Sequence, residues 1–110
     1  MTTERCARIR VLNDQLRQQH AGGRIFLTQG VMELGDLFVA ASLMHVAKFS
    51  DFSPDNDPYG EHDFGAVTVG AKRVFWKIDY YDQSLTSCAV DPAEPTGCVR
   101  VMTIMLAEEY

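Results

Sequence analysis

The residues most suited to chemistry lie in one stretch of the chain, between positions 51 and 82. The first part of this stretch is punctuated by proline and glycine and holds five carboxylates and a histidine: Asp51, Asp55, Asp57, Glu61, His62 and Asp63. It leads directly into an aromatic, strand-like run over positions 74–82. Binding and catalytic groups are commonly mounted on loops that a rigid scaffold holds in place. We therefore expect any functional site to lie in this acidic loop.

General acid–base catalysis is one chemistry that these residues suit. An imidazole changes its charge near neutral pH, and a neighbouring carboxylate can fix its tautomer. Adjacent residues of an extended segment point to opposite faces, so Glu61 and Asp63 cannot readily share the face of His62. A partner such as Asp79 or Asp82 would have to come from the strand beyond. The candidates for a hydrolase are therefore Glu61, His62, Asp63 and Asp79. The alternative is that these side chains fix the loop to the sheet by hydrogen bonds.

Clustered carboxylates also suit a hard cation such as calcium. An EF-hand loop counted from Asp55 has the required glycine, Gly60, at its sixth position, but Ala66 stands where the twelfth must be a bidentate glutamate. Counting from Asp51 fits no better. Aspartate and asparagine side chains that bond their own backbone, together with prolines, form such a turn without any ligand. We therefore predict no metal site and no cofactor.

The charge balance narrows the choice of partner. A formal net charge of −5 argues against nucleic acid as the main partner, because such binding depends on lysines and arginines that neutralise phosphates. Negative charge instead steers association with basic protein surfaces, and tyrosine is common among the residues that dominate interfaces. We therefore predict a surface that binds a protein with a basic face, made of Asp55, Asp57, Tyr59, Glu61, Tyr81 and Asp82.

The cysteines and the absence of long apolar runs favour a cytoplasmic protein. Cys6, Cys88 and Cys98 make an odd set without a CxxC pair, and the arginine-rich beginning of the chain does not resemble a secretory leader. A disulfide between Cys88 and Cys98 is conceivable, but free thiols are the default in a reducing compartment. No apolar run approaches the roughly 20 residues that span a bilayer. We expect no membrane segment.

Two helices and a first strand are predicted in the first half of the chain. Apolar residues at helical spacing predict an amphipathic helix from Thr3 to about His20, and a β-prone run follows at positions 24–28. A second helix is predicted from Leu37 to about Phe49, with Asp36 as its N-cap. The stripe of this helix that we expect to be buried consists of Ala40, Leu43, Met44 and Ala47.

The second half predicts three strands. Positions 64–69 and 73–81 form a hairpin through Gly70, and the apolar, β-branched run at 99–106 is a buried strand. Both faces of the segment 73–81 carry aromatic side chains, which indicates a central strand. The order α-β-α-β-β-β predicts one α+β domain over residues 1–110. We expect two helices on one face of an antiparallel sheet of about four strands, with the hairpin paired to 99–106.

Three motifs carry a resemblance to a known family. They are DFSPDNDPYGEHDFG at 51–65, FWKIDYYD at 75–82 and RVMTIMLAEEY at 100–110. Together they resemble a small proteobacterial family of unknown function that is often found among accessory genes. The resemblance covers nearly the whole chain. It implies a bacterial cytosolic setting, but no assigned activity and no functional residue. It also implies a role in conflict between mobile elements and their hosts rather than in housekeeping metabolism.

We therefore expect an acidic protein that acts by binding another protein through its acidic loop and exposed aromatic residues. One form of this function is an anti-defence inhibitor, of the anti-CRISPR or anti-restriction type, whose carboxylates stand in for DNA phosphates. A small metal-dependent or acid–base hydrolase is the main alternative. An intracellular sensor of a ligand or metal is another. The sequence leaves the partner, the process and the oligomeric state open.

Overall fold

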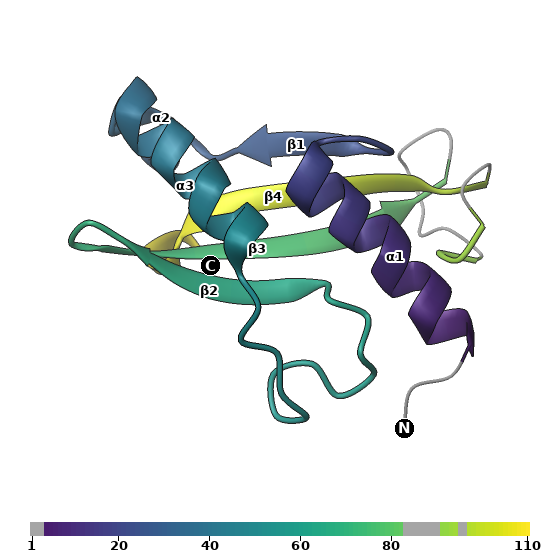
Figure 1. Ribbon diagram of the computed structural model, residues 1–110. Coiled ribbons are helices and arrows are strands. Elements are labelled where there is room, and N and C mark those ends of the chain that lie inside the picture. Colours follow the sequence, from purple (N-terminus) through teal and green to yellow (C-terminus); the bar gives the residue numbers. More distant parts are fainter. Residues whose placement is uncertain (1–3, 83–90, 95–96) are drawn as a thin grey trace.

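The structure is a computed structural model that describes residues 4–82, 91–94 and 97–110 (Figure 1). The predicted α+β class is confirmed. The elements follow in the order α1 (Glu4–Gln19), β1 (Arg24–Leu27), α2 (Gln29–Glu33), α3 (Asp36–Lys48), β2 (Phe64–Val69), β3 (Lys72–Tyr81) and β4 (Val99–Leu106), with a final 3₁₀ turn at Ala107–Glu109.

The sheet has the strand order β1-β4-β3-β2. Strand β3 is central and antiparallel to both β2 and β4, so the predicted pairing of the hairpin with 99–106 is confirmed. The expectation of an all-antiparallel sheet is wrong at one edge, because β1 pairs in parallel with β4. A strand of four residues carries no local signal for its partner or direction, so the sequence could not specify this edge.

All three helices lie on one face of the sheet (Figure 1). The core under them contains Val74, Trp76 and Ile78 of β3, which meet Leu16 of α1 and Val46 of α3. Each such large side chain contributes roughly 1.5–3 kcal/mol when it leaves water. The opposite face of β3 is partly open to solvent, as its alternation of residues predicts.

The buried face of α3 differs from the predicted one. Ser42 and Val46 are its buried residues, whereas Ala40 and Met44 of the predicted stripe are exposed. Apolar residues surround this helix on nearly every side, so their spacing cannot select the face that packs. The short helix α2 was also not predicted, because five residues are too few for a periodic pattern.

The C-terminal turn is attached to the start of α2 through one carboxylate. Glu109 Oε1 accepts hydrogen bonds from Thr28 Oγ1 at 2.6 Å and from the Leu106 amide at 2.8 Å, and Oε2 accepts one from the Gly30 amide at 3.1 Å. These hydrogen bonds favour the charged form and hold the pKa of Glu109 below its ordinary value, with the Thr28 hydroxyl as the largest cause.

Replacing this carboxylate should therefore cost stability in a pH-dependent way. A lowered pKa means that Glu109 contributes stability above its ordinary pKa of 4.5, and that this contribution is lost as the pH falls through the folded-state value. We expect Glu109→Gln to lower the Tm at neutral pH and to approach the wild type in acid. Thermal denaturation across pH measures both. Glu108→Gln is the control, and an equal effect of the two substitutions would contradict the assignment.

Candidate functional site

The acidic loop connects α3 to β2 and extends beyond the β2 edge of the sheet (Figure 1). Its first turn is closed by its own side chains. Asn56 Oδ1 accepts a hydrogen bond from the Ser53 amide at 2.9 Å, and Asn56 Nδ2 donates to the Asp51 carbonyl at 2.9 Å. The Asp57 amide donates to the Ser53 carbonyl at 2.8 Å. The loop is thus the self-bonded turn that its aspartate, asparagine and proline content favours.

Asp57 faces the inside of this loop, so its predicted place on the partner-binding surface is wrong. The residue is only 8% exposed. Its Oδ1 accepts hydrogen bonds from the amides of Glu61 at 3.1 Å and His62 at 3.2 Å. A buried carboxylate needs such donors to offset its desolvation, and two successive backbone amides supply them here. The role of Asp57 is to fix the loop backbone.

His62 is held on three sides. Its ring stacks on Phe52 with the centroids 3.6 Å apart and the planes 3° from parallel. Nδ1 lies 2.9 Å from Asp14 Oδ1, and Nε2 lies 3.6 Å from Asp57 Oδ2. Because an aspartate carboxylate only accepts hydrogen bonds, Nδ1 is the donor to Asp14. The backbone of His62 has a φ of 55°, a left-handed conformation that is uncommon outside glycine and is found at functional and tightly constrained sites.

Asp14 connects this histidine to a buried arginine. Asp14 Oδ1 also accepts a hydrogen bond from Arg17 Nη2 at 2.9 Å. Arg17 is 2% exposed, and its Nη1 donates to three carbonyls at the end of α3, those of Val46, Ala47 and Phe49, at 2.8, 3.1 and 2.8 Å. We call Arg17, Asp14, His62 and Asp57 the polar chain. It joins α1, α3 and the acidic loop.

A second set of hydrogen bonds attaches the loop to the sheet. Asn13 Nδ2 donates to the Glu61 carbonyl at 3.0 Å and to the Tyr80 hydroxyl at 2.8 Å. Arg100 Nε donates to Asn13 Oδ1 at 2.9 Å, and the guanidinium lies over the Tyr80 ring. Burial raises the pKa of Tyr80, so its hydroxyl stays protonated. The loop is therefore fixed from both α1 and β3.

The side chain of His62 makes its contacts with residues outside the set of hydrolase candidates. The side chain of His62 contacts Asp14, Asp57 and Phe52, while Asp79 forms an ion pair with Lys77 at 3.3 Å. Asp63 is attached to β3 through its carbonyl, which accepts the Ile78 amide at 2.8 Å. Its pKa is raised, first by burial and then by the nearby charges of Glu61, Asp57 and Asp79.

The loop borders a shallow, open hollow of about 340 Å³. It is lined by Phe52, Ser53, Pro54, Asp57, Pro58, Gly60 and His62. Two of the lining residues, Asp57 and His62, contact each other. Within residues 4–82, 91–94 and 97–110, no three histidine, cysteine, aspartate or glutamate side chains are placed to hold a metal ion.

The remaining residues of the predicted partner-binding surface divide between two places. Asp55 and Tyr59 are exposed on the outside of the loop, Tyr59 by 64%, and Glu61 is half-buried beside them in sequence. Tyr81 lies on the face of the sheet that carries no helix, where it lines a different hollow of about 230 Å³ with Phe26, Val101 and Thr103. Asp82, which follows it, is half-buried. Asp55 and Tyr59 therefore form the outer surface of the loop.

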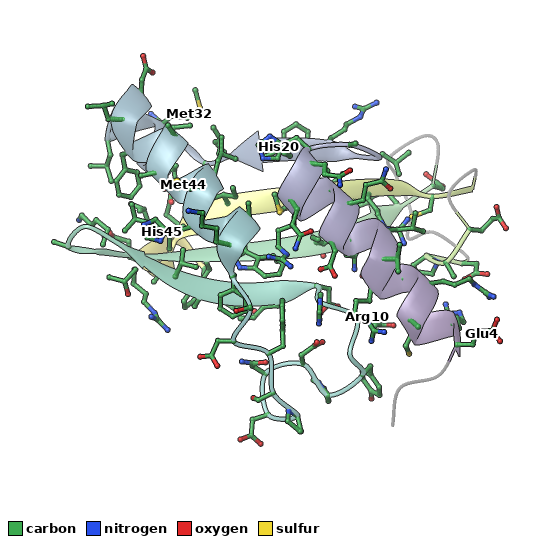
Figure 2. All side chains as sticks on the ribbon, in the orientation of Figure 1. Glu4, Arg10, His20, Met32, Met44 and His45 are labelled. Carbon is green, nitrogen blue, oxygen red and sulfur yellow. The ribbon has the colours of Figure 1, made fainter. Side chains whose placement is uncertain are left out.

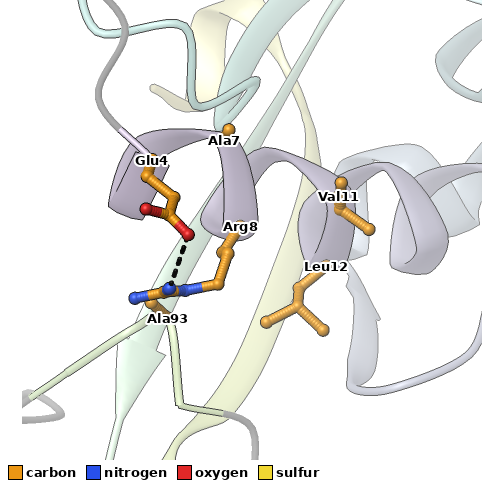
Figure 3. A pocket seen from close by; sticks show the side chains of 6 residues that line it. All are labelled: Glu4, Ala7, Arg8, Val11, Leu12 and Ala93. Atoms are coloured by element: carbon orange, nitrogen blue, oxygen red, sulfur yellow. Dashed lines mark ion pairs between the residues drawn. The ribbon is translucent and has the colours of Figure 1, made fainter.

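A third hollow, of about 400 Å³, lies along α1 (Figure 3). Its lining residues are Glu4, Ala7, Arg8, Val11, Leu12 and Ala93. The two charged side chains at this hollow are exposed and lie 3.6 Å apart, so they pair with each other. Apolar side chains make up the rest of the wall, and this hollow brings no catalytic groups together.

Both cysteines in the described part of the chain, Cys6 and Cys98, are buried. Burial raises the pKa of Cys98, which lowers the reactivity of its thiol. Cys88, which could form a disulfide with Cys98, lies outside the described residues.

Comparison with known proteins supports one part of the resemblance seen in the sequence, membership of a family of unknown function. Residues 27–109 match the family model described as a protein of unknown function, DUF3768. The chain belongs to this family. No curated protein and no solved structure matches it. The family match includes the acidic loop and the strands β2, β3 and β4. It begins at the last residue of β1, so it leaves out α1, the helix that supplies Asp14 and Arg17 to the polar chain. Among the described residues, no helix has both the length and the apolar character needed to cross a membrane.

Asp14 was not among the predicted site residues, although it is the centre of the polar chain. Its partners His62 and Arg17 lie 48 and 3 positions away, and the sequence shows only an acid on a mixed helix face. We expect Asp14→Ala to destabilise the fold by on the order of 2 kcal/mol, because it removes two hydrogen bonds to charged or chargeable groups. Chemical denaturation measures this loss.

Hydrogen exchange separates that effect from a general loss of stability. The amides of Glu61 and His62 should exchange faster in Asp14→Ala than in Gln18→Ala, an exposed substitution on the same helix. Unchanged exchange at these amides would contradict the role assigned to the polar chain.

Replacing Asp63 should have the opposite effect on stability from replacing Glu109. Its pKa is raised above the ordinary value of 3.8, so the ionised carboxylate opposes folding, and stability falls as the pH rises through the folded-state pKa. Asp63→Asn should therefore raise the Tm at neutral pH and lose this advantage at about pH 3. The exposed Asp55→Asn is the control, for which we expect little change. A lower Tm of Asp63→Asn at neutral pH would refute this account.

Proposed function

We propose that this protein binds another protein through the outer surface of its acidic loop. The observation that supports the proposal is the division of the loop into two layers. Phe52, Asp57 and His62 are engaged inside it, whereas Asp55 and Tyr59 project to solvent. A loop fixed in advance loses little conformational entropy on binding, so its exposed anchors contribute more to affinity.

The chemistry of this outer surface fits a basic partner. Asp51, Asp55 and Tyr59 are all exposed on the loop, and the chain as a whole carries a net charge of −5. Carboxylates around an aromatic side chain suit a partner that offers lysines or arginines around an apolar pocket. Tyr59 is the anchor in this proposal, and the two acids guide the encounter.

The finer form of the proposal is inhibition of a nuclease in a bacterial cytoplasm. A protein that binds DNA presents a basic groove, and a rigid loop of carboxylates can occupy such a groove in place of phosphates. The resemblance of the three motifs to proteobacterial accessory proteins supports this form, which belongs to anti-defence functions of the anti-CRISPR or anti-restriction type.

A competition experiment tests this proposal with defined components. Purified defence nucleases of the host that carries the gene are mixed with labelled DNA, and the protein is titrated in. We expect DNA release that weakens as salt rises, because the Debye length falls to about 8 Å at physiological ionic strength. Asp51→Asn with Asp55→Asn should mainly slow association, and Tyr59→Ala should speed dissociation, with a loss of on the order of 2 kcal/mol.

The control variant neutralises the same number of acidic residues outside the loop. Glu4→Gln with Glu108→Gln neutralises two largely exposed acids outside the loop and should leave binding nearly unchanged. Equal effects of the two double variants would show that total charge acts rather than the loop. Binding that resists both salt and the loop substitutions would refute the proposal.

One observation favours a second candidate, acid–base hydrolysis. His62 lines the hollow in the loop, and Asp14 orients its ring as a carboxylate orients a catalytic imidazole. Against this, Nε2 faces Asp57 rather than open space. A screen of hydrolase substrates with the wild type and His62→Gln decides between the two, since turnover that depends on His62 would favour the enzyme.

A further inference from the structure

Aromatic side chains gather on the side of the sheet that no helix of the described residues covers, which we call the open face (Figure 1). The residues of β3 alternate, so those that stand between the buried Val74, Trp76 and Ile78 belong to the open face. Its aromatic residues come from β1, β2, β3 and the end of the final turn: they are Phe26, Phe64, Phe75, Tyr81 and Tyr110. A half-solvated sheet face with such side chains is a surface on which planar rings can stack. Figure 2 shows the helix side of the molecule, where Glu4, Arg10 and His45 lie.

A hollow of about 230 Å³ on the open face has an aromatic residue at each end. It is lined by Phe26, Tyr81, Val101 and Thr103. Phe26 pairs with Thr103 and Tyr81 pairs with Val99, so Val101 lies between the two aromatic residues. The four residues of β4 that separate them span about 13 Å along the strand. Phe26 and Tyr81 therefore offer two separate stacking positions rather than one slot for a single ring.

A second aromatic cluster continues the same face. The rings of Phe64, Phe75 and Tyr110 meet edge to face, with centroids 5.4 to 5.8 Å apart. Tyr110 is 73% exposed. Lys77 lies between this cluster and the hollow, because it pairs with Phe64 on one side and with Thr103 on the other. Aromatic surface thus extends along the open face on both sides of a basic residue.

The charges of the sheet differ in sign from that of the whole chain. The four strands hold one acidic residue, Asp79, and five basic ones: Arg24, Lys72, Arg73, Lys77 and Arg100. Arg100 is buried against α1, and Lys72 forms an ion pair with Glu108. The other three belong to the open face by their register, and Arg24 is exposed without an acidic partner among the described residues. The net charge of −5 therefore comes from other parts of the chain, and the open face suits an anion.

We propose that the open face binds single-stranded nucleic acid. Bases stack on Phe26, Tyr81 and Tyr110, and phosphates lie at Arg24 and Lys77. Aromatic platforms beside basic side chains are the general means by which proteins hold single strands, whose unpaired bases offer their faces for stacking. The platforms and the basic residues are spread along the face, which favours a strand over a free nucleotide. This ligand is a second one beside the protein partner of the acidic loop, and the inference does not rest on that partner.

Fluorescence polarisation with a labelled single strand of about eight nucleotides tests the proposal. The wild type should bind this strand, and a base-paired duplex or a free mononucleotide should compete only weakly. Phe26→Ala carries little risk to the fold, because Phe26 is 52% exposed. It should raise the Kd about tenfold, which corresponds to about 1.4 kcal/mol, since one base loses its stacking partner. Tyr59→Ala, at a 64% exposed aromatic position of the acidic loop, is the matched control and should leave the Kd unchanged.

Salt dependence tests the phosphate contacts. For a single strand, each phosphate that a protein neutralises changes the slope of log K against log salt by about 0.7. Arg24→Gln should therefore make the slope shallower by about that amount. Arg8→Gln, at an arginine of α1 that is also exposed, is the matched control and should keep the wild-type slope. Tyr81→Phe keeps the ring and should bind as the wild type does, whereas Tyr81→Ala should bind more weakly. Circular dichroism checks that each variant is folded.

A wild-type protein that does not bind the single strand would overturn the proposal. Binding that survives both Phe26→Ala and Tyr81→Ala would place the strand elsewhere on the molecule and overturn it as well. Equal affinity for the duplex would show that stacking is not involved, and equal affinity for the mononucleotide would show a small-molecule site, so either result would refute the open face as a single-strand surface. An unchanged salt slope in Arg24→Gln would refute the phosphate contact assigned to this arginine.

Discussion

The buried guanidinium of Arg17 is the constraint on which the arrangement of this molecule depends. A charge taken out of water must be paired and hydrogen-bonded, or the fold loses several kcal/mol. Arg17 meets this need with three carbonyls at the end of α3, with Asp14 and with the rings of Phe52 and Trp76. One side chain of α1 therefore fixes where α3 ends and where the loop after it begins.

The same logic explains why so few of the loop acids reach the surface. Asp57 serves two backbone amides, and Asp63 is half-buried at the start of β2. The tight turn at His62 has a left-handed backbone, which is tolerated because stacking, Asp14 and Asp57 hold the residue in place. Counting carboxylates thus overstates the acidic surface. The useful quantity is the number of carboxylates that remain exposed once the backbone amides of the loop have their hydrogen bonds.

The sequence predicted what local patterns encode and missed what distant contacts decide. The alternation of β3, the glycine turn and the β-branched run of β4 specify their own structure, so the hairpin and its pairing were predictable. The parallel pairing of β1 and the link from Asp14 to His62 depend on residues far apart in the chain. Asp57 was assigned to the wrong side of the loop because turn propensity predicts a turn without saying which carboxylate closes it.

The wrong prediction for the buried face of α3 has a different cause. An amphipathic pattern identifies the buried side only when the other side is polar, and here Leu37 and Met44 remain outside after the sheet has buried Val46. An apolar residue that the core does not use costs solubility unless another surface covers it. The exposure of these side chains therefore reflects which face of the helix the sheet covers, and the residue pattern of the helix does not specify that face.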